Sequence, residues 1–325
     1  MADGTRIEWT DATWNPIVGC SVVSAGCRHC YAMRLAGTRL RHHPTRKGLT
    51  DDTKAGPVWN GQVRFNDAEL VRPLSWRRPR RIFVCAHGDL FHEAVPAAWI
   101  DKVFAIMALC RQHSFQVLTK RPERARAYLS HSSKASELLD RNLVDMRIDL
   151  AVKEIAGEAA AWTTQLGGCN GWPLDNVWLG VSVEDQETAN ERIPYLLSTP
   201  AALYWISAEP LLGPVDLKAV PWGHAHAMLR IGWVVTGGES GPGARPMHPD
   251  WARSLRDQCA AAGVPFLFKQ WGEWAPADPD MPSETQESEE IAGRLDWPMH
   301  RVGKNAAGRL LDGVLHDGFP EVRHG

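Results

Sequence analysis

Three cysteines within eleven residues could act together on one metal centre. Cys20, Cys27 and Cys30 form the pattern C-x6-C-x2-C near the N-terminus. Two thiolates separated by two residues can bind one metal from a tight turn, and the third reaches it across a loop that contains Gly26. Structural zinc sites and electron-transfer clusters normally have four protein ligands. Three cysteines therefore favour an iron–sulfur cluster with one iron left open for chemistry.

Two other interpretations of this motif stay open. A disulfide with a spare thiol is one, although nothing in the sequence indicates secretion. A zinc site completed by His29 or by a distant residue is the other, because C-x2-C is a common zinc half-site. The other four cysteines are scattered singly. Cys85 and Cys110 lie in apolar runs, so we expect both to be buried small hydrophobic residues.

Composition bounds the class of protein. The 325 residues suffice for two average domains or for one α/β barrel, and 44% hydrophobic with 23% charged residues is typical of a globular core. The net charge of −2 gives no overall attraction to nucleic acid or to anionic membranes. The N-terminus has no apolar signal region, and no apolar run approaches eighteen residues. We therefore expect a cytoplasmic protein with reduced thiols and no membrane association.

Apolar, strand-like runs alternate with helical segments along the chain. Continuous apolar strands that alternate with helices predict a parallel sheet covered on both faces. The expected fold is α/β, a partial or near-complete (β/α) barrel of six to seven parallel strands. The expected strands lie within 7–17, 81–85, 114–118, 176–183, 202–207, 231–235 and 264–268, and the main helices within 29–41, 96–110, 122 onward, 184–197 and 249–262.

Three segments depart from this alternation: residues 43–66, residues 131–170 and the C-terminal residues 276–325. Residues 43–66 are polar and contain Gly and Pro, so we expect a loop excursion. Residues 131–170 have helical composition and no strand, which predicts a helical insertion that acts as a lid or a packing arm. The expected domains are thus a barrel over 1–275 with this insertion, and a C-terminal extension over 276–325 that packs on the barrel.

Polar residues follow the predicted strands directly. In α/β barrels the active site is built at the carboxyl ends of the strands, so these side chains are candidates for one site. Each alone would be an ordinary cap or turn residue, and their shared position is what carries the prediction. They are His87, Asp89, His92, Glu93, Lys120, Arg121, Ser182, Glu184, Glu209, Glu239, Ser240, Lys269 and Gln270.

A three-cysteine loop near the N-terminus of an α/β barrel, followed by the aromatic Tyr31, resembles the radical S-adenosylmethionine superfamily. Over most of residues 5–275 and again over about 299–320, the chain is similar to a bacterial and phage family with a three-cysteine motif and no established substrate. The first spacing, six residues, departs from the three residues commonest in the superfamily. The motifs that carry the similarity begin at Trp14, Leu118, Asn176, Glu209, Gly237 and Phe268 and read WNP, LTKRP, NVWLGVSVE, EPLLG, GGESG and FKQWG.

This resemblance implies a cofactor and a chemistry. Cys20, Cys27 and Cys30 would hold a [4Fe–4S] cluster whose open iron binds the amino and carboxylate groups of S-adenosylmethionine. Reduction by an external donor of the flavodoxin or ferredoxin type would release a 5′-deoxyadenosyl radical, which abstracts hydrogen from the substrate. The protein supplies placement and exclusion of water.

The resemblance also implies roles for the residues that follow the strands. By position, the cofactor contacts would be Tyr31 on the adenine, Gly88 and Asp89 at the methionine amino group, Lys120 or Arg121 at its carboxylate, and Ser182 and Glu184 at the ribose. Late in the chain, the substrate candidates are Glu209, Glu239, Arg245 and Lys269. The alternative for these charges is surface ion pairing or helix capping.

The substrate itself is left open by the sequence. A nucleotide, a nucleic acid or a peptide would each suit a radical enzyme. The basic cluster Arg77–Arg81, flanked by Trp76, could touch phosphate, although arginines before a strand are more often a solvated edge. A non-catalytic protein stabilised by zinc or by a cluster, on the same barrel, is the alternative function.

Overall fold

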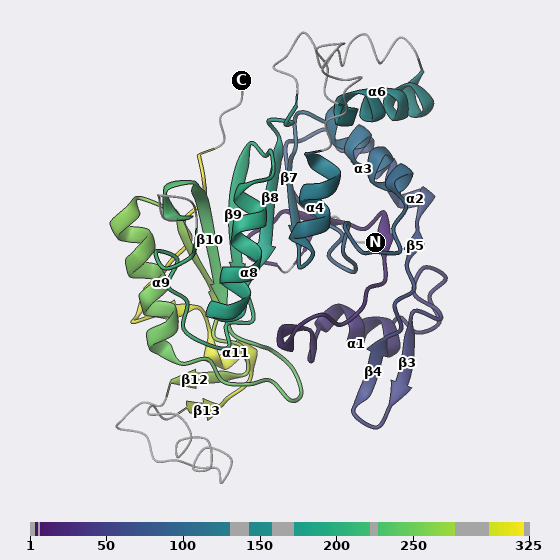
Figure 1. Ribbon diagram of the computed structural model, residues 1–325. Helices are drawn as coiled ribbons and strands as arrows, with labels where there is room; N and C mark the ends of the chain where they lie inside the picture. The colour runs from purple at the N-terminus through teal and green to yellow at the C-terminus, as the bar shows by residue number, and fades with distance from the viewer. Residues whose placement is uncertain are drawn as a thin grey trace. The chain divides into compact units, whose positions relative to one another are not determined.

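The computed structural model describes residues 4–5, 7–130, 143–157, 172–221, 227–276 and 299–321. Its main sheet has seven strands in the order β1-β6-β7-β8-β9-β10-β11 (Figure 1). The pairs β1·β6, β6·β7, β7·β8 and β10·β11 are parallel. The α/β fold class of a partial (β/α) barrel is therefore confirmed. The strands are Ala12–Trp14, Arg81–Val84, Ser114–Thr119, Val177–Ser182, Leu203–Ala208, Ile231–Gly237 and Phe266–Gln270.

The chain divides into two compact units by its internal contacts. Unit 1 comprises Met1–Val22, Ala32–Val181 and Tyr195–Tyr204. Unit 2 comprises Val23–Tyr31, Ser182–Pro194 and Trp205–Gly325. The cysteine motif is thus shared, with Cys20 in unit 1 and both Cys27 and Cys30 in unit 2.

Unit 1 has its core around strands β1, β6 and β7. All residues of β7 but one are buried, as expected for a strand covered on both faces. Trp14 and Phe115 are fully buried with ring centroids 5.6 Å apart. Asn176 closes this core, because its amide donates to three carbonyls at the end of α3 and the start of β7. The helices of this unit include α3 (Ala97–Leu109) and α4 (Pro122–Leu129).

Helix α6 (Leu143–Ala156) is the described part of the expected insertion, and it packs along α3 (Figure 1). Val144, Ile148 and Val152 are buried on one face at helical spacing. On α6, Arg147 pairs with Asp101 of α3 at 3.2 Å. This helix is therefore a packing arm of unit 1; the flanking residues 131–142 and 158–170 lie outside the described part.

The excursion after the cysteine loop is more regular than the sequence predicts. The loop prediction for residues 43–66 is wrong, because β3 (Thr50–Thr53) and β4 (Gly56–Trp59) form an antiparallel hairpin. A second short pair joins β5 (Arg64–Phe65) to β2 (Ile17–Val18). The hairpin is largely exposed, so it lacks the apolar alternation by which strands are recognised.

Helix α1 (Tyr31–Gly37) is also shorter than the segment 29–41 predicts. A Cβ atom at Gly37 would overlap the side chain of Pro57 on β4. The helix therefore ends where the hairpin crosses it, although apolar residues continue to Leu40. The tertiary contact overrides the local helical pattern.

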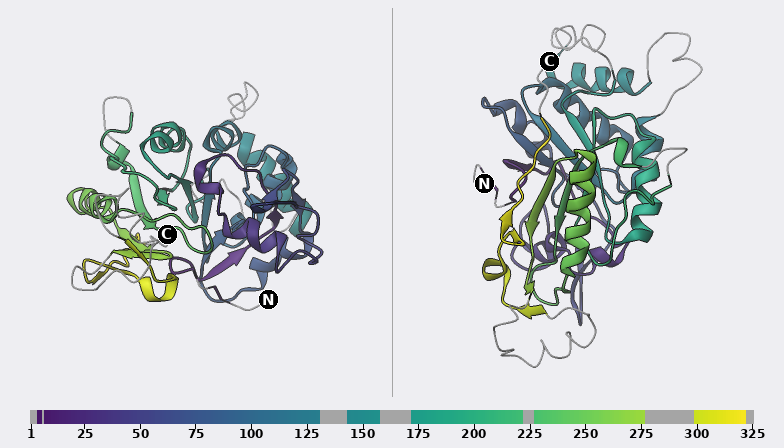
Figure 2. Two further views of the ribbon diagram at one scale, coloured as in Figure 1. Left: turned by 90° about the horizontal axis from the view of Figure 1, so that it is seen from below. Right: turned by 90° about the vertical axis from the view of Figure 1, so that its left-hand side faces the viewer.

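Unit 2 contains β10, β11 and helix α9 (Pro249–Ala262), which lies against both strands (Figure 2). His248 caps α9 by accepting from the Asp250 amide at 3.1 Å, and Pro249 occupies the first turn. Gly263 ends the helix in the left-handed conformation, with φ of 67°. Start and stop signals of this kind explain why this helix is predicted correctly over 249–262.

The C-terminal residues continue along β11. Trp274–Pro276 (β12) pairs antiparallel with Met299–Arg301 (β13), and Leu310–Leu311 (β14) pairs with Val314–Leu315 (β15). Backbone bonds then join Phe268 to His316 and Phe266 to Gly318. Trp233 on β10 donates its indole N–H to the Gly318 carbonyl at 2.8 Å. Within the described ranges, no helix has the length and apolar character needed to cross a membrane.

Candidate functional site

The motif cysteines differ from the other described cysteines in exposure. Cys20, Cys27 and Cys30 are each partly exposed. The other described cysteines, Cys85, Cys110 and Cys259, are buried, which confirms the prediction for Cys85 and Cys110. Among residues that the structure describes, no three His, Cys, Asp or Glu side chains already form a group able to hold a metal ion. Cys20 belongs to unit 1, and Cys27 and Cys30 belong to unit 2.

In unit 1, Cys20 lies beside the nearly buried guanidinium of Arg121, just after β7. Arg121 Nη1 donates to Cys20 Sγ at 3.5 Å and to Asp89 Oδ2 at 3.2 Å. Its Nε donates to Glu93 Oε1 at 2.8 Å, and its Nη2 donates to Ser21 Oγ at 2.6 Å. We call these five residues the Arg121 cluster. It fixes the thiol and the residue that follows it against the ends of β6 and β7.

Asp89 organises this end of the sheet from a buried position. Its Oδ1 accepts from the Thr119 hydroxyl at 2.8 Å and from the Phe91 amide at 2.9 Å. Its Oδ2 accepts from the Lys120 amide at 3.1 Å and from Arg121. The carboxylate assigned from sequence to the methionine amino group thus has protein donors at both oxygens.

At position 88, next to Asp89, close backbone packing requires glycine. Gly88 forms a parallel bridge with Gly19. A Cβ at Gly88 would lie 3.0 Å from the Gly19 carbonyl oxygen and 3.1 Å from that of Ile17. Glycine at this position lets the segment that leads to Cys20 approach the end of β6.

The charged groups of the Arg121 cluster have opposing effects on the pKa of the Cys20 thiol. Burial, and after it Asp89, raise the pKa of the Cys20 thiol and Arg121 lowers it, with a net pKa of about 12. Burial by itself would lower the pKa of Arg121, but Asp89, Cys20 and Glu93 raise it overall. The guanidinium therefore stays charged, and together with the Ser21 backbone it favours the thiolate form of Cys20. A metal that binds Cys20 must displace the thiol proton.

In unit 2, the rest of the cysteine loop is anchored on Glu184. This carboxylate is fully buried, and Arg192 Nη1 donates to its Oε2 at 3.1 Å. Ser24 Oγ donates to Oε1 at 3.1 Å and lies 3.8 Å from Cys27 Sγ. A Cβ at Gly26 would be 2.5 Å from Oε1, so only glycine fits between the loop and the carboxylate. We call Ser24, Gly26, Cys27, Glu184 and Arg192 the Glu184 cluster.

A second ion pair of unit 2 holds the same loop from another side. Arg245 pairs with the buried Glu239 through two nitrogens, at 2.6 and 2.9 Å. Its Nη2 also donates to the Ala25 carbonyl at 3.0 Å. His29 packs against Gly243, where a Cβ would lie 2.9 Å from the imidazole ring. Glu239 and Arg245, predicted as substrate contacts, are thus brought to the cysteine loop.

Four further predicted residues belong to unit 2, and one, Lys120, belongs to unit 1. Lys269 and Glu209 form an ion pair at 2.9 Å, with both side chains mostly buried. Tyr31 is 46% exposed. Ser182 is buried, and its carbonyl accepts from Arg192 at 2.8 Å. Lys120, of unit 1, contributes its backbone amide to Asp89.

Comparison with known proteins gives one match. The model of a family described as "Protein of unknown function (DUF5131)" matches residues 4–320. The chain belongs to the DUF5131 family. No curated protein and no solved structure matches it.

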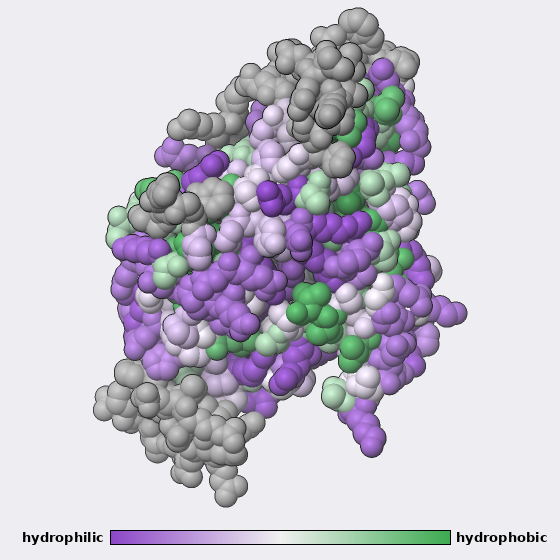
Figure 3. Space-filling view, in the orientation of Figure 1, coloured by the Kyte–Doolittle hydropathy of each residue, from purple (hydrophilic) through white to green (hydrophobic). Residues whose placement is uncertain are grey.

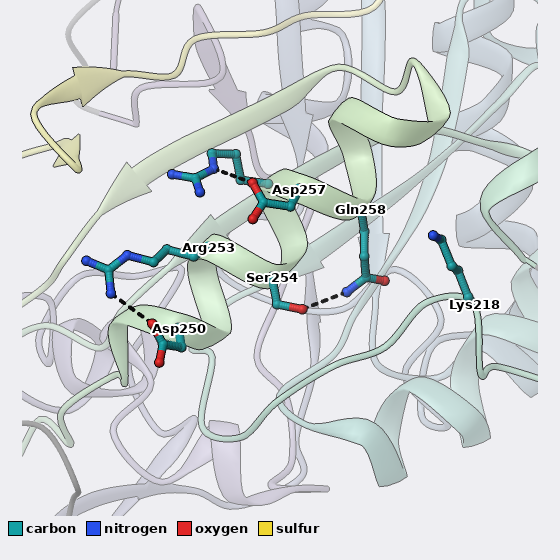
Figure 4. A pocket seen from close by; sticks show the side chains of 7 residues that line it. Lys218, Asp250, Arg253, Ser254, Asp257 and Gln258 are labelled. Atoms are coloured by element: carbon teal, nitrogen blue, oxygen red, sulfur yellow. Dashed lines mark hydrogen bonds and ion pairs between the residues drawn. The ribbon is translucent and has the colours of Figure 1, made fainter.

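A separate surface of the DUF5131 chain is a shallow polar depression along α9 (Figure 4). Its arginines are neutralised by neighbours: Arg253 pairs with Asp250 and Asp312, and Arg256 pairs with Asp257 and Asp312. None of the motif cysteines lines it. It is a salt-bridged surface that ties α9 to the turn between β14 and β15.

Sequence reasoning missed several residues of the two clusters in this DUF5131 chain. Ser21 and Ser24 lie inside the cysteine loop and could have been identified as candidate neighbours of the motif thiols. Arg192 follows Glu184 by eight residues on α8 (Gln186–Leu197), and no sequence signal distinguishes it from a solvated helical arginine. Of the two buried arginines in these clusters, Arg121 is among the predicted residues and Arg192 is not.

Proposed function

We propose that this chain is a radical S-adenosylmethionine enzyme in which Cys20, Cys27 and Cys30 hold a [4Fe–4S] cluster. One observation carries the proposal: the motif thiols are partly exposed, while the other described cysteines are buried. Partly exposed, fixed thiols suit metal binding, and buried thiols are inert. The resemblance of the C-x6-C-x2-C loop and of the motifs after the strands to this superfamily supports the same function.

The residues present fit such a group. All three motif residues are partly exposed cysteines, and thiolates are the ligands that iron–sulfur clusters use. Cys20 Sγ accepts from a guanidinium, and a serine hydroxyl lies near Cys27 Sγ. Donors to cluster sulfurs tune the reduction potential of such centres. When bound, the cluster would supply one-electron chemistry on S-adenosylmethionine.

The protein's own residues would then bind, orient and shield. Arg121 would hold Cys20 and balance the negative charge that thiolate ligation adds. Glu184, through Ser24, would fix the loop that carries Cys27. Exposed Tyr31, directly after the last cysteine, would offer an aromatic face to the adenine.

The charged pairs Lys269–Glu209 and Arg245–Glu239 would face the substrate, whose class is a nucleotide, a nucleic acid or a peptide. An external flavodoxin- or ferredoxin-type donor would provide electrons. The reduced thiols and the electron donor both imply a cytoplasmic enzyme.

The test begins with protein purified and reconstituted without oxygen. It should be brown and contain about four irons per chain. Replacing Cys20, Cys27 or Cys30 by Ala should abolish the colour, whereas Cys259→Ala, a matched change at a buried thiol, should keep it. With dithionite and S-adenosylmethionine, the wild-type protein should form 5′-deoxyadenosine.

Two results would overturn the proposal. Stoichiometric zinc with no iron after anaerobic reconstitution would favour the zinc-stabilised binding protein. A cluster that survives each of the three cysteine replacements would show that the motif is not its ligand set.

A further inference from the structure

The basic residues of this chain are concentrated in one stretch. Residues 31–81 contain twelve Arg and Lys but four Asp and Glu, a formal net charge of +8. The whole chain carries −2, so the other residues together carry −10. A segment of such charge on a slightly acidic protein marks a surface for a polyanion, since the local field and not the net charge steers binding.

Only part of this stretch presents its charge to solvent. At residues 72–81, Arg72 and Arg80 lie over the Trp76 ring, 5.6 and 5.0 Å from its centroid, and Arg81 pairs with Asp11 at 2.9 Å. Those three arginines serve packing or pairing, whereas Arg77 and Arg78 between them are exposed. The other part, residues 38–54, comprises the turns after α1 and the β3–β4 hairpin up to its tip. We call residues 38–54 the basic loop.

Several cationic side chains of the basic loop are exposed to solvent. Arg39, Arg41, Lys47 and Lys54 are exposed, as are His42 and His43. Arg41 pairs with Asp52 at 2.7 Å, but both side chains are more than half exposed, so this pair is weak. Arg39, Lys47 and Lys54 have no ion pair with any described residue. In Figure 3 the tip of the hairpin, at the lower right, is hydrophilic.

Two further arginines hold the loop in shape. Arg64 donates to the Pro44 carbonyl at 2.8 Å and to the Lys47 carbonyl at 2.9 Å. The buried Arg46 donates to Thr45 Oγ1 and to His87 Nδ1, in the loop after β6. Preformed cationic loops bind with less loss of conformational entropy than flexible ones.

The same excursion is bonded to the segment that carries Cys20. The Gly61 amide donates to the Cys20 carbonyl at 3.2 Å, and Val18 pairs with Arg64 between β2 and β5. Anything held by the basic loop is therefore held on the same rigid part of unit 1 as the first motif cysteine.

Nucleic acid fits this surface better than an anionic membrane. Segments that lie in a membrane interface insert large apolar side chains beside their basic residues. No large apolar side chain is exposed in the basic loop or elsewhere between residues 32 and 65. Exposed cations without apolar anchors match a phosphate backbone, where Arg and Lys neutralise phosphates and release counterions.

We propose that the basic loop is a nucleic-acid-binding surface that contacts the phosphate backbone through Arg39, Arg41, Lys47 and Lys54. The binding goes beyond the proposed function and does not depend on it. If both hold, the substrate of the enzyme is a nucleic acid.

The experiment is fluorescence anisotropy with labelled random-sequence duplex and single-stranded DNA and RNA, using the full chain as purified in air without cofactor. Four phosphate contacts predict a slope of log affinity against log salt of about −3 to −4 between 50 and 200 mM KCl. The triple variant R39A/K47A/K54A should bind at least about thirtyfold more weakly at 50 mM and flatten the slope to about −1.

The matched control is R111A/R126A/K218A, which removes the same charge from other surfaces and should bind as the wild type does. Melting curves of both triples should match that of the wild type, since all three residues of the loop variant are exposed. Absence of binding at 50 mM, or equal loss in both triples, would overturn the proposal. Binding to vesicles with anionic lipid but to no nucleic acid would overturn it too. Because no cluster is needed, failure here leaves the radical chemistry untouched.

Discussion

Replacing Glu184 should destabilise the fold, because its carboxylate is paired inside unit 2. The carboxylate has no exposed surface, and the side chain of Arg192 is 3% exposed. Removing one partner of a buried ion pair costs about 3–5 kcal/mol, since the other charge stays buried without compensation. Glu184→Ala also removes the acceptor of Ser24, which costs about 1 kcal/mol more. We therefore expect Glu184→Ala to lower the free energy of unfolding by about 4 kcal/mol or more.

The measurement is urea denaturation of the cofactor-free protein, followed by tryptophan fluorescence. Glu187→Ala, an exposed change on α8, the helix that carries Arg192, is the control and should stay within about 0.5 kcal/mol of the wild type. Arg192→Met should be costly alone. The double variant Glu184→Gln/Arg192→Met should lose less free energy of unfolding than the two single changes added together, and the difference should be at least about 1 kcal/mol. Wild-type stability of Glu184→Ala would refute the reasoning and restore Glu184 as a carboxylate kept for a ligand.

The release of the loop can be followed separately. Without Glu184, Ser24 loses its anchor, so the loop that carries Cys27 and Cys30 should open more often. Both thiols should then react faster with a disulfide reagent under native conditions, while the rate at the buried Cys110 should stay low.

Three other predictions concern the same architecture. Gly26→Ala should weaken iron incorporation and speed thiol labelling of Cys27, because a Cβ would lie 2.5 Å from Glu184 Oε1; equal incorporation in mutant and wild type would contradict this. Deleting residues 131–170, which removes α6 and bares the α3 face it covers, should lower stability by several kcal/mol by urea titration, since each large side chain buried there contributes about 1.5–3 kcal/mol. Arg253 and Arg256 lower the pKa of Asp312, so their pairing stabilises the protein above the unfolded pKa of about 4 and is lost as pH falls through the lower folded value. Asp312→Asn should therefore cost at most about 1 kcal/mol at pH 7 and nothing near pH 2, and a constant difference across this range would contradict it.

The sequence predicts those elements whose signals are local. β8 is a nearly continuous apolar run, and α9 carries its cap, its first-turn proline and its terminal glycine in the chain itself. The end of α1 is decided by a contact with Pro57, twenty residues away, which no window along the chain reveals. The exposed β3–β4 hairpin gives no apolar alternation to detect.

The candidate site follows the same rule. The position of Asp89 and Glu184 after buried strands predicts where their carboxylates lie, at the carboxyl ends of β6 and β8. It does not predict what they contact: Arg121 is predicted at the same edge of the sheet but not as a partner of Asp89, and Arg192 lies on a helical segment whose sequence gives no sign of its burial. Burial of these four charges is a tertiary property, and it changes how Asp89 and Glu184 are interpreted, from groups kept for a ligand to groups that also hold the cysteine loop.

The strand-like tail along β11 has a consequence for how molecules of this protein behave in a crowded solution. β11 is the last strand of the sheet, and its outer N–H and C=O groups would otherwise form an open template for another chain. The bridge between Leu267 and Asp317, the amide of Phe268 on His316, and Gly318 against Phe266 occupy that template from within the same chain. A Cβ at Gly318 would lie 2.7 Å from the Phe266 carbonyl oxygen, so the tail is fitted to the strand at close range. A chain shortened before residue 309 would present a bare strand edge, and edge-to-edge association into aggregates would compete with its folding.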